Sequence, residues 1–521
     1  MHLVLGGVLC LLHCAFALKS SSPALRVLPP PRSIALDGPP LPVSSFALEA
    51  ASEGALHPYI ALAFERFLQR LPAAPAALPL GAVQSRVSVA VASGELRLDE
   101  LTDYSYTLHA TPDGAVRIAS PTVYGAVYAL ESLAQLVEAG GALQHERIAI
   151  ADAPNFAWRG LMVDSGRRFF PMPTLLNLLD TMLAVKLNVL HLHASDECRF
   201  SVESKLFPNL TASLQGALGG FYTQDDIRDL VSNATARGIR VVPEFDIPSH
   251  SRGLRSIKSE GIVFCTDAPT QSQIYGDPAN STFNTLVTLF NEISALFPDP
   301  VFHIGADETS ALGPCTVDST FALERRVLSH LEGTLGKTAA GWEEILFDAG
   351  AATNKTIVYA WSRHTPQEII SAGRRAVDSA SGDFYMTEPA GPYPGGWKNF
   401  WYDISTGVAP ADIGMLLGSE MSMWTDSYCS PVEAGGQQCG AYSGPPQVGA
   451  PLFPPERDAE WERSIGGMMF PRGFVGAMAY WNYNGSIDSQ SDAFVTALWD
   501  LNDKILAAGG ASCPTKCVRC S

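Results

Sequence analysis

The sequence predicts an α/β protein in which a large (β/α)₈ barrel, the TIM barrel fold, follows a smaller α+β domain. After Trp158, short apolar runs alternate eight times with longer segments of helical periodicity, over roughly 340 residues. Before that point the pattern is mixed, with strand-like alternation and one strongly helical segment. The 521 residues, 46% of them hydrophobic, suffice for two domains with a substantial core.

Residues 1–17 are typical of a secretory signal peptide. An apolar run from Leu3 to Leu12 precedes Ala15-Phe16-Ala17, an A-x-A cleavage pattern. A buried N-terminal helix is the alternative interpretation. Residues 18–45 are rich in Pro and Ser and predict an irregular lead-in. The signal predicts a chain of the secretory pathway, either extracellular or in a lysosome-like compartment. No later stretch is long and apolar enough to predict a transmembrane segment.

Two sequence features agree with a secreted glycoprotein. Five glycosylation sequons begin at Asn209, Asn233, Asn280, Asn354 and Asn484. Without the two in the signal peptide, eight cysteines remain: Cys198, Cys265, Cys315, Cys429, Cys439, Cys513, Cys517 and Cys520. An even number in a secreted chain predicts disulfides. The tail 509–521 ends in "CPTKCVRC", which in an oxidising compartment favours a disulfide-tied tail over a metal site.

Residues 46–153 predict the α+β accessory domain, and residues 154–508 predict the barrel. In the first, "SRVSVAV" and "YSYTLHA" alternate like strands, and "YGAVYALESLAQLVEA" has helical periodicity. "ADAPNFAWRG" marks the boundary between the domains. The barrel strand candidates are "GLMVDS", "NVLHLHAS", "RVVPEFD", "VFHIGA", "TAAGWEE", "TIVYAW", "AVDSAS" and "MLLGSEMSMW". "SDAFVTALWDLNDKILAAG" predicts a closing helix.

The formal net charge of −18 narrows the partners of the chain. An acidic chain argues against nucleic acid and against anionic membranes. It is compatible with neutral or cationic substrates and with an acidic compartment. The sequence leaves a homodimer open.

The predicted strands end in residues suited to sugar chemistry. Barrel enzymes place their chemistry at the C-terminal ends of the strands. Here these ends carry Asp164, Arg167, His193, Asp196, Glu197, Glu244, Asp246, His250, Asp307, Glu308, Trp342, Glu343, Trp361, Tyr385, Trp424 and Asp426. Tryptophan rings cover the apolar faces of pyranoses, and Asp–Arg pairs fix hydroxyls through charge-assisted hydrogen bonds. We therefore expect glycoside binding and cleavage.

The segment "VFHIGADETS", Val301 to Ser310, places two acids side by side where a strand ends. Most glycosidases hold two carboxyls on opposite sides of the scissile bond, which neighbours in sequence cannot do. Substrate-assisted glycosidases are an exception, because the 2-acetamido oxygen of the substrate is their nucleophile. One acid can then orient the acetamido group while the other protonates the leaving oxygen. This interpretation requires an N-acetylhexosamine substrate.

Over nearly the whole chain, these motifs resemble the β-N-acetylhexosaminidases of glycoside hydrolase family 20. The segment before the barrel is similar to the accessory domain of that family, and "HIGADE" resembles its most specific signature. Asp307 then corresponds to the acetamido-orienting residue and Glu308 to the general acid/base. "PEFDIPSH" places His250 beside the acid. The resemblance implies a glycan substrate with a terminal N-acetylhexosamine, and neither a cofactor nor a metal.

The same resemblance assigns the sugar pocket. "RGLMVDSGRRFFP" gives Arg167 as the arginine that binds the hydroxyls, and "HLHASDE" gives Asp196 as its brace. "GWEE", "YAW" and "MSMW" supply the pocket walls Trp342, Trp361 and Trp424, and Tyr385 corresponds to the tyrosine that hydrogen-bonds the acetamido oxygen. Cys265 and Cys315 match a family disulfide beside the site.

Four positions depart from the family pattern. Arg168 replaces the usual histidine, and Glu197 replaces the second acid of an Asp-Asp pair. Thr387 replaces an aspartate, and Asp426 replaces a glutamate. The last two correspond to positions that read the 4- and 6-hydroxyls of the sugar, so they affect the preference between GlcNAc and GalNAc.

Two other functions fit parts of the pattern. A metal-dependent barrel hydrolase could use His191 and His193, which share one face of a strand, together with His250 and His303. A non-catalytic glycan-binding protein on the same barrel is suggested by Thr387 and Asp426.

Overall fold

The computed structural model describes residues 25–50, 57–72, 81–138, 140–212, 214, 220–268, 271–386, 398–425 and 469–510. Several predictions fall outside the described residues, namely the signal peptide 1–17, Thr387, Asp426, Cys429, Cys439, Cys513, Cys517 and Cys520.

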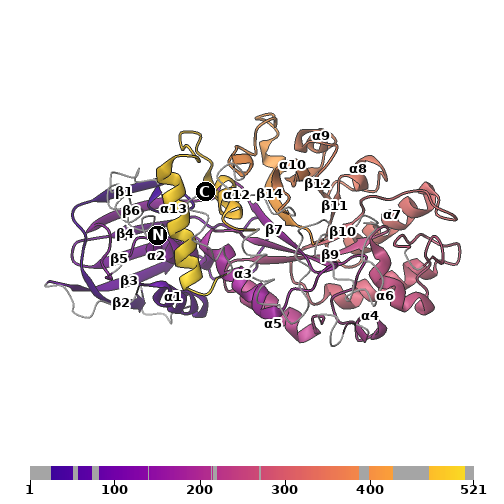
Figure 1. Cartoon of the computed structure of the whole chain (residues 1–521), viewed down its shortest axis with the longest axis horizontal. Coiled ribbons are helices and arrows are strands. Elements are labelled where there is room, and N and C mark those ends of the chain that lie inside the picture. Colours follow the sequence, from indigo (N-terminus) through magenta and orange to yellow (C-terminus); the bar gives the residue numbers. More distant parts are fainter. Residues whose placement is uncertain are drawn as a thin grey trace, which may run out of the picture.

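The accessory domain is a six-stranded sheet with two helices packed on one face (Figure 1). Its strands are β1 (Ser33–Asp37), β2 (Val43–Ala50), β3 (Val83–Val91), β4 (Tyr106–Ala110), β5 (Ala115–Ser120) and β6 (Arg147–Asp152), in the order β1-β6-β4-β5-β3-β2. The helices are α1 (Pro58–Arg70) and α2 (Val123–Gln135). All residues of α2 are buried, because this helix contacts the sheet on one side and the barrel helix α3 on the other.

The irregular lead-in predicted for residues 18–45 is partly wrong. Residues Ser33–Asp37 form β1, an edge strand that pairs antiparallel with β6, and β2 begins at Val43. The short alternating run "SIALD" supplies this strand between two Pro-containing stretches, and the Pro and Ser content concealed it.

The eight predicted barrel strands are confirmed as one closed parallel barrel. They are β7 (Trp158–Asp164), β8 (Val189–Ser195), β9 (Arg240–Ile247), β10 (Val301–Gly305), β11 (Thr338–Trp342), β12 (Ile357–Ala360), β13 (Arg375–Asp378) and β14 (Leu416–Met423). β14 closes the barrel on β7, with Gly418 opposite Trp158 and Met423 opposite Val163. The strands are buried almost throughout, as expected for a parallel sheet covered by helices.

Helices and short helical turns connect the strands. The α-helices are α3 (Met172–Ala184), α4 (Asn209–Ala212), α5 (Gln224–Thr235), α6 (Ser281–Ser294), α7 (Val317–Gly333), α8 (Glu344–Phe347), α9 (Pro366–Ser371), α10 (Ser381–Phe384), α12 (Arg472–Asn482) and α13 (Asp492–Ala507), and the 3₁₀ turns are η3 (Ser251–Glu260), η4 (Lys398–Phe400) and η5 (Ile413–Met415). The sequence of α5 shows why a helix forms there. Thr223 and Asp226 form a capping box at its start, and its apolar side is buried. Among the described residues, no helix has the length and apolarity needed to cross a membrane.

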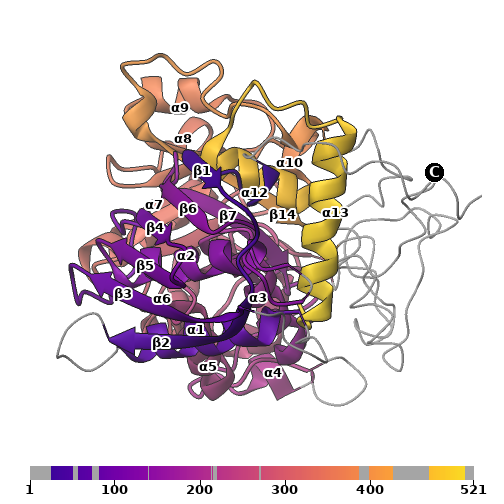
Figure 2. The ribbon, with the colours of Figure 1, turned by 90° about the vertical axis from the view of Figure 1, so that its left-hand side faces the viewer.

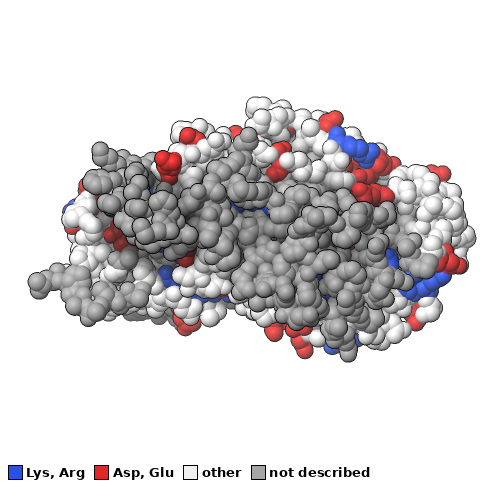
Figure 3. Space-filling view, viewed as in Figure 1, with Lys and Arg blue, Asp and Glu red and all other residues white. Residues whose placement is uncertain are grey.

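The two domains are joined through buried polar contacts. Lys186, at the start of the segment leading into β8, donates from Nζ to Asp152 Oδ2 at 2.8 Å and to the Tyr106 hydroxyl at 2.9 Å. Trp481 of α12 donates to the other oxygen of Asp152. The closing helix α13 contacts α1 of the accessory domain (Figures 1 and 2). Acidic side chains are spread along the described part of the face in Figure 3.

Candidate active site

The acid pair lies where β10 ends, in a backbone of unusual conformation. Gly305, Ala306 and Glu308 all have positive φ, at 70°, 71° and 49°. A side chain at Gly305 would place its Cβ 1.8 Å from an oxygen of Asp246, so only glycine fits there. These left-handed residues end the alternation of the strand, and the two neighbouring carboxylates enter different environments.

Asp307 is the buried member of the pair. Burial raises the pKa of its carboxyl, and the charges of Glu244 and Glu308 add to that effect, while His250 opposes it. Its Oδ1 atom has no hydrogen-bond partner among the described residues, and Oδ2 lies 3.7 Å from His250 Nε2. Beside it, burial and the charge of Asp307 raise the pKa of Asp246 well above its usual range. A protonated Asp246 can donate a hydrogen bond to ionised Asp307.

Glu308 is the exposed member, with 58% of its side chain accessible. Its Oε2 lies 3.2 Å from His250 Nε2, and this hydrogen bond lowers the pKa of the carboxyl. Burial works against a charge on His250, yet Asp196 and Asp307 raise its pKa well above the usual value. His250 itself has a positive φ of 51°, which turns its ring from the end of β9 toward Glu308. The predicted neighbourhood of these two residues is confirmed.

Arg167 is held by two carboxylates. Its Nη1 donates to Asp164 Oδ2 at 3.1 Å, and its Nη2 lies 2.9 Å from Asp196 Oδ2. Arg167 also lies over the ring of Trp424, with 5.1 Å from Cζ to the ring centroid. Burial alone would raise the pKa of Asp196, but Arg167 and His250 hold it well below the usual range. Asp196 therefore braces the arginine, as expected from the sequence.

Four aromatic rings stand together beside the acids. Trp342 lies with its ring centroid 5.8 Å from Trp424 and 6.5 Å from Trp361. Tyr385 lies 6.0 Å from Trp424 and is nearly parallel to Trp361 at 6.5 Å. Trp342 and Trp424 are buried, whereas Trp361 and Tyr385 are partly exposed. The structure thus brings together every described residue that the sequence assigned to the pocket.

The two acids of "GWEE" hold Trp361, a role that the sequence reasoning missed. Glu343 accepts hydrogen bonds from the four successive backbone N–H groups of residues 361–364. Glu344 accepts from the indole N–H of Trp361 at 3.0 Å. Burial and the charge of Asp307 raise the pKa of Glu344 to about 7. The signal was the second acid after Trp342, which the strand-end argument left without a role.

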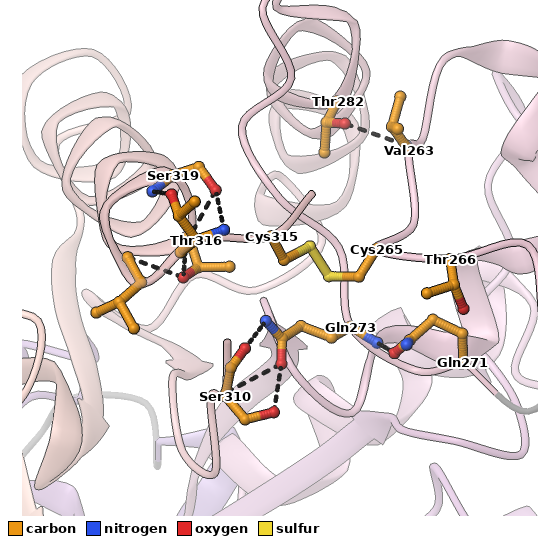
Figure 4. The surroundings of a disulfide bond; sticks show 12 residues. Val263, Cys265, Thr266, Gln271, Gln273, Thr282, Ser310, Cys315, Thr316 and Ser319 are labelled. Atoms are coloured by element: carbon orange, nitrogen blue, oxygen red, sulfur yellow. Dashed lines mark hydrogen bonds between the residues drawn. A yellow bond between two sulfur atoms is a disulfide. The ribbon is translucent and has the colours of Figure 1, made fainter. Parts of the chain in front are cut away.

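The predicted disulfide between Cys265 and Cys315 is present, with the two Cα atoms 5.2 Å apart. It joins the loop after η3 to the loop after β10, which also carries the acid pair. Figure 4 shows Gln273 beside the disulfide, with its side chain facing Ser310. Gln273 donates to the carbonyl of Ser310 at 2.7 Å and accepts from its N–H at 3.0 Å. The Gln273 side chain therefore fixes both backbone groups of Ser310, two residues after Glu308.

The histidines of the metal-dependent alternative do not form a single ligand set. Among the described residues, His191, His303 and Glu244 form one group in the barrel interior, with one possible ligand atom from each lying within 4.8 Å of the others. His250 belongs to other groups, with Asp196 and Glu197 or with Asp246 and Asp307. The expectation that the protein uses no metal stays a prediction.

Comparison with known proteins agrees with this geometry. Residues 156–427 match the model of the family described as glycosyl hydrolase family 20, catalytic domain. Beta-hexosaminidase subunit A1 of Dictyostelium discoideum is 28% identical over 433 residues, which cover 77% of this chain and 80% of that relative. The Homo sapiens beta-hexosaminidase subunit beta is 30% identical over 356 residues, 62% of each chain.

Solved structures show the same architecture. The chitobiase of Flavobacterium johnsoniae superposes with a TM-score of 0.73 at 23% identity, covering 94% of this chain and 74% of that one. The N-acetyl-beta-hexosaminidase of Streptomyces plicatus gives 0.70 at 20% identity, covering 95% and 97%. The family match spans more than half of the 521 residues and contains the acid pair, the arginine and the aromatic walls. The chain is therefore a glycoside hydrolase and belongs to glycosyl hydrolase family 20.

Proposed function

We propose that the chain is an exo-acting β-N-acetylhexosaminidase that removes terminal, non-reducing β-linked GlcNAc or GalNAc from glycoconjugates or chitooligosaccharides. The observation that carries the proposal is the division of the acid pair. Asp307 is buried, and its Oδ1 has no hydrogen-bond partner among the described residues, whereas Glu308 is exposed and hydrogen-bonded to His250. The names of the hexosaminidase relatives support the same activity.

In the proposed complex, the terminal sugar enters with its ring among the aromatic side chains. Arg167, fixed by Asp164 and Asp196, donates hydrogen bonds to sugar hydroxyls. Trp342, Trp361 and Trp424 surround the acetamido methyl group, and Tyr385 donates to the acetamido oxygen. Because both ends of Trp361 are fixed by the "GWEE" acids, this wall needs no rearrangement when substrate binds.

The first chemical step uses the substrate as its own nucleophile. The acetamido oxygen attacks the anomeric carbon while the bond to the leaving oxygen breaks, and Glu308 transfers its proton to that oxygen. The product in the site is an oxazolinium ion, whose positive charge lies beside ionised Asp307. Asp307 accepts a hydrogen bond from the acetamido N–H and stabilises that charge from its buried position.

The second step reverses the roles of the groups. Glu308, now a carboxylate, takes a proton from a water molecule that attacks the anomeric carbon. The acetamido oxygen leaves, and the sugar is released with its original β configuration. His250, charged by its position between Asp196 and Glu308, stabilises the carboxylate form of Glu308 between the two steps. The low pKa of Glu308 in the free enzyme favours an acidic working pH, where more of it carries the proton.

The cellular setting stays a prediction. The signal peptide and the sequons support a glycoprotein that is secreted or delivered to a lysosome-like compartment, and mammalian beta-hexosaminidase subunits are among the relatives. A loss of mass on treatment with an endoglycosidase would test whether the chain is N-glycosylated. Light scattering of the purified enzyme would test whether it forms a homodimer. The preference between GlcNAc and GalNAc depends on Thr387 and Asp426, which lie outside the described residues.

The test of the function compares an aryl β-N-acetylglucosaminide with the matching aryl β-glucoside, alongside a thiazoline that mimics the cyclised intermediate. We expect turnover of the first substrate only, with retention of configuration, and binding of the thiazoline much tighter than that of GlcNAc. Comparable turnover of both substrates would show that a protein carboxylate is the nucleophile. Binding without any turnover would favour the non-catalytic glycan-binding alternative.

A further inference from the structure

Beneath the active site, the barrel interior contains a buried polar cluster that the proposed mechanism does not use. The Glu244 cluster consists of His191, His193, Glu244 and His303, all with 0% exposure. His191 and His193 are two residues apart on β8, so both point to the interior. Glu244 lies on the neighbouring strand β9, directly opposite His193.

Glu244 contacts one indole and three imidazole rings. Its Oε1 accepts from Trp342 Nε1 at 3.0 Å and lies 2.9 Å from His303 Nδ1, which also accepts from the backbone N–H of Gly305 at 3.1 Å. Its Oε2 lies 2.5 Å from His193 Nδ1 and 3.1 Å from His191 Nε2. Burial would favour the neutral acid, but the neighbouring histidines, His193 first, lower the pKa of Glu244 well below its usual range. The cluster thus has an ionised carboxylate at its centre.

His193 bridges this carboxylate to the active site. Its Nδ1 lies 2.5 Å from Glu244 Oε2, and its Nε2 lies 2.7 Å from Asp196 Oδ2. An ionised carboxylate oxygen can only accept, so a ring nitrogen that faces one at such a distance donates a hydrogen bond to it, and here both nitrogens do so. A ring that carries both N–H groups is an imidazolium. Although burial opposes the charge, Glu244 and Asp196 raise the pKa of His193 well above its usual value.

Asp196 connects His193 to the sugar-binding arginine and to the histidine beside the general acid. Its Oδ2 is shared between His193 and Arg167, which lies at 2.9 Å. Its Oδ1 lies 3.4 Å from His250 Nδ1, and His250 in turn contacts Glu308. His193 is therefore one hydrogen-bonded residue away from the sugar-binding arginine and two away from the general acid.

We propose that His193 is a positioning residue of the glycosidase reaction, whose charged ring fixes Asp196 so that Arg167 and His250 keep their working orientations. The inference rests on the proposed function. Without His193, Asp196 would keep Arg167 at Oδ2 and, at Oδ1, the backbone N–H of Glu197 beside His250, and Oδ2 could follow the movements of the arginine side chain. His193 limits this movement because Glu244, which fixes the other side of its ring, is itself held by Trp342. The aromatic wall and the acid are coupled through the barrel interior.

His191 provides a matched control on the same strand. It has the same burial and also lies between two carboxylates, with Nδ1 2.7 Å from Glu420 and Nε2 3.1 Å from Glu244. Its carboxylate partners are interior residues, however, and neither of them is Asp196. His191→Gln therefore also disturbs Glu244, but it leaves the contact between His193 and Asp196 in place, so a loss shared by the two variants measures the disturbed barrel interior. A purely structural role for these histidines would give the two variants the same behaviour.

The experiment compares wild type, His193→Gln and His191→Gln on aryl β-N-acetylglucosaminides whose phenols span a range of leaving-group pKa. We expect both variants to melt at lower temperature. Only His193→Gln should raise KM several-fold, through Arg167, and lose kcat increasingly with poorer leaving groups, up to about 10²-fold, because the general acid is misplaced. Equal kinetic constants for the two variants, per folded molecule, would overturn the proposal.

A second measurement avoids the variant altogether, in case His193→Gln does not fold. In wild-type enzyme labelled with ¹⁵N-histidine, the buried imidazole N–H signals report the cluster, and His191→Gln identifies those of His191. Binding of the thiazoline should shift the His193 signals more than the His191 signals. Shifts of equal size would contradict the inference. If wild-type enzyme neither hydrolyses the aryl N-acetylglucosaminides nor binds the thiazoline, the proposed function itself fails, whatever the variants do.

Discussion

His250 Nε2 lies 3.2 Å from Glu308 Oε2, and this contact joins a charged imidazole to an exposed carboxyl at the mouth of the barrel. The other nitrogen of His250 faces Asp196 at 3.4 Å. The arrangement orients Glu308 and stabilises its carboxylate form. It supports the proposal that Glu308 acts first as an acid and then as a base.

Glu308→Gln should remove the proton donor while keeping the contact with His250, because the amide oxygen can still accept a hydrogen bond. On substrates with poor leaving groups, we expect kcat to fall by about 10²–10⁴-fold, the usual contribution of general acid–base catalysis. On an activated aryl substrate, the first step should suffer much less. Near-normal hydrolysis of a natural disaccharide by this variant would rule out the assignment.

Asp307→Asn should keep the shape of the site and remove its charge. Because the oxazolinium charge develops only along the reaction, we expect kcat to fall by about 10²–10³-fold while KM changes little. Steady-state kinetics on the aryl β-N-acetylglucosaminide measure both constants, and thiazoline binding should weaken in parallel. If only KM rises in the variant and kcat is unchanged, Asp307 contributes to substrate binding and not specifically to stabilising the transition state.

His250→Asn should move the alkaline limb of the activity profile. His250 lowers the pKa of Glu308, so its removal should let Glu308 keep its proton to higher pH, while kcat falls because the acid is less well oriented. The pH dependence of kcat/KM for both enzymes measures the shift. An alkaline limb that stays in place, or moves to lower pH, would show that His250 does not set the protonation of Glu308.

Much of the barrel could be predicted because its signals are local. Eight apolar runs with polar ends mark the strands, and the acid pair at Gly305 marks a strand that must stop. The accessory sheet was harder to predict. β1 is a five-residue edge strand, and its partner β6 lies more than a hundred residues later in the sequence, so no local pattern indicates their pairing.

The interior of the site escaped prediction for a different reason. The sequence shows His191 and His193 on one face of a strand, a pattern equally suited to metal binding and to ion pairs. Only the fold places Glu244 between them and Asp196 beyond. Glu344 likewise follows Trp342 in the chain, but its partner Trp361 arrives from the next strand. Such pairings depend on the register between strands, which a single sequence does not encode visibly.

Removing the Cys265–Cys315 disulfide should loosen the acid loop. The bond closes a loop of 50 residues, so the double variant to serine should lose about 2–4 kcal/mol of the free energy of unfolding. We expect a lower Tm together with a smaller loss of kcat, because Gln273 still holds Ser310. Thermal melts and kinetics of the double variant, with reduced wild type for comparison, measure the two effects. Peptide mapping that finds both thiols free in wild type would contradict the bond itself.

Glu344 should make the protein less stable as pH rises toward neutrality. Its pKa is about 7 in the folded protein and near 4.5 when unfolded, because folding buries it near Asp307. Below pH 4.5 Glu344 is protonated in both the folded and the unfolded state, so it does not change the free energy of unfolding with pH. Between pH 4.5 and 7 the unfolded state releases the proton while the folded state keeps it, so unfolding becomes easier with each step in pH.

The expected loss from this one carboxyl is on the order of 3 kcal/mol across that window, and it is complete once the pH exceeds the folded pKa. Glu344→Gln should therefore flatten the fall in Tm between pH 4.5 and 7, and its amide oxygen can still accept from Trp361. Glu65→Gln, at an exposed position of α1, is the control and should follow wild type. If the Glu344→Gln and wild-type curves of Tm against pH run parallel, Glu344 does not hold its proton in the folded enzyme. Any loss of stability toward neutral pH would then have to come from other buried acids, and among the described residues Asp246 and Glu324 have pKa values raised well above the usual range.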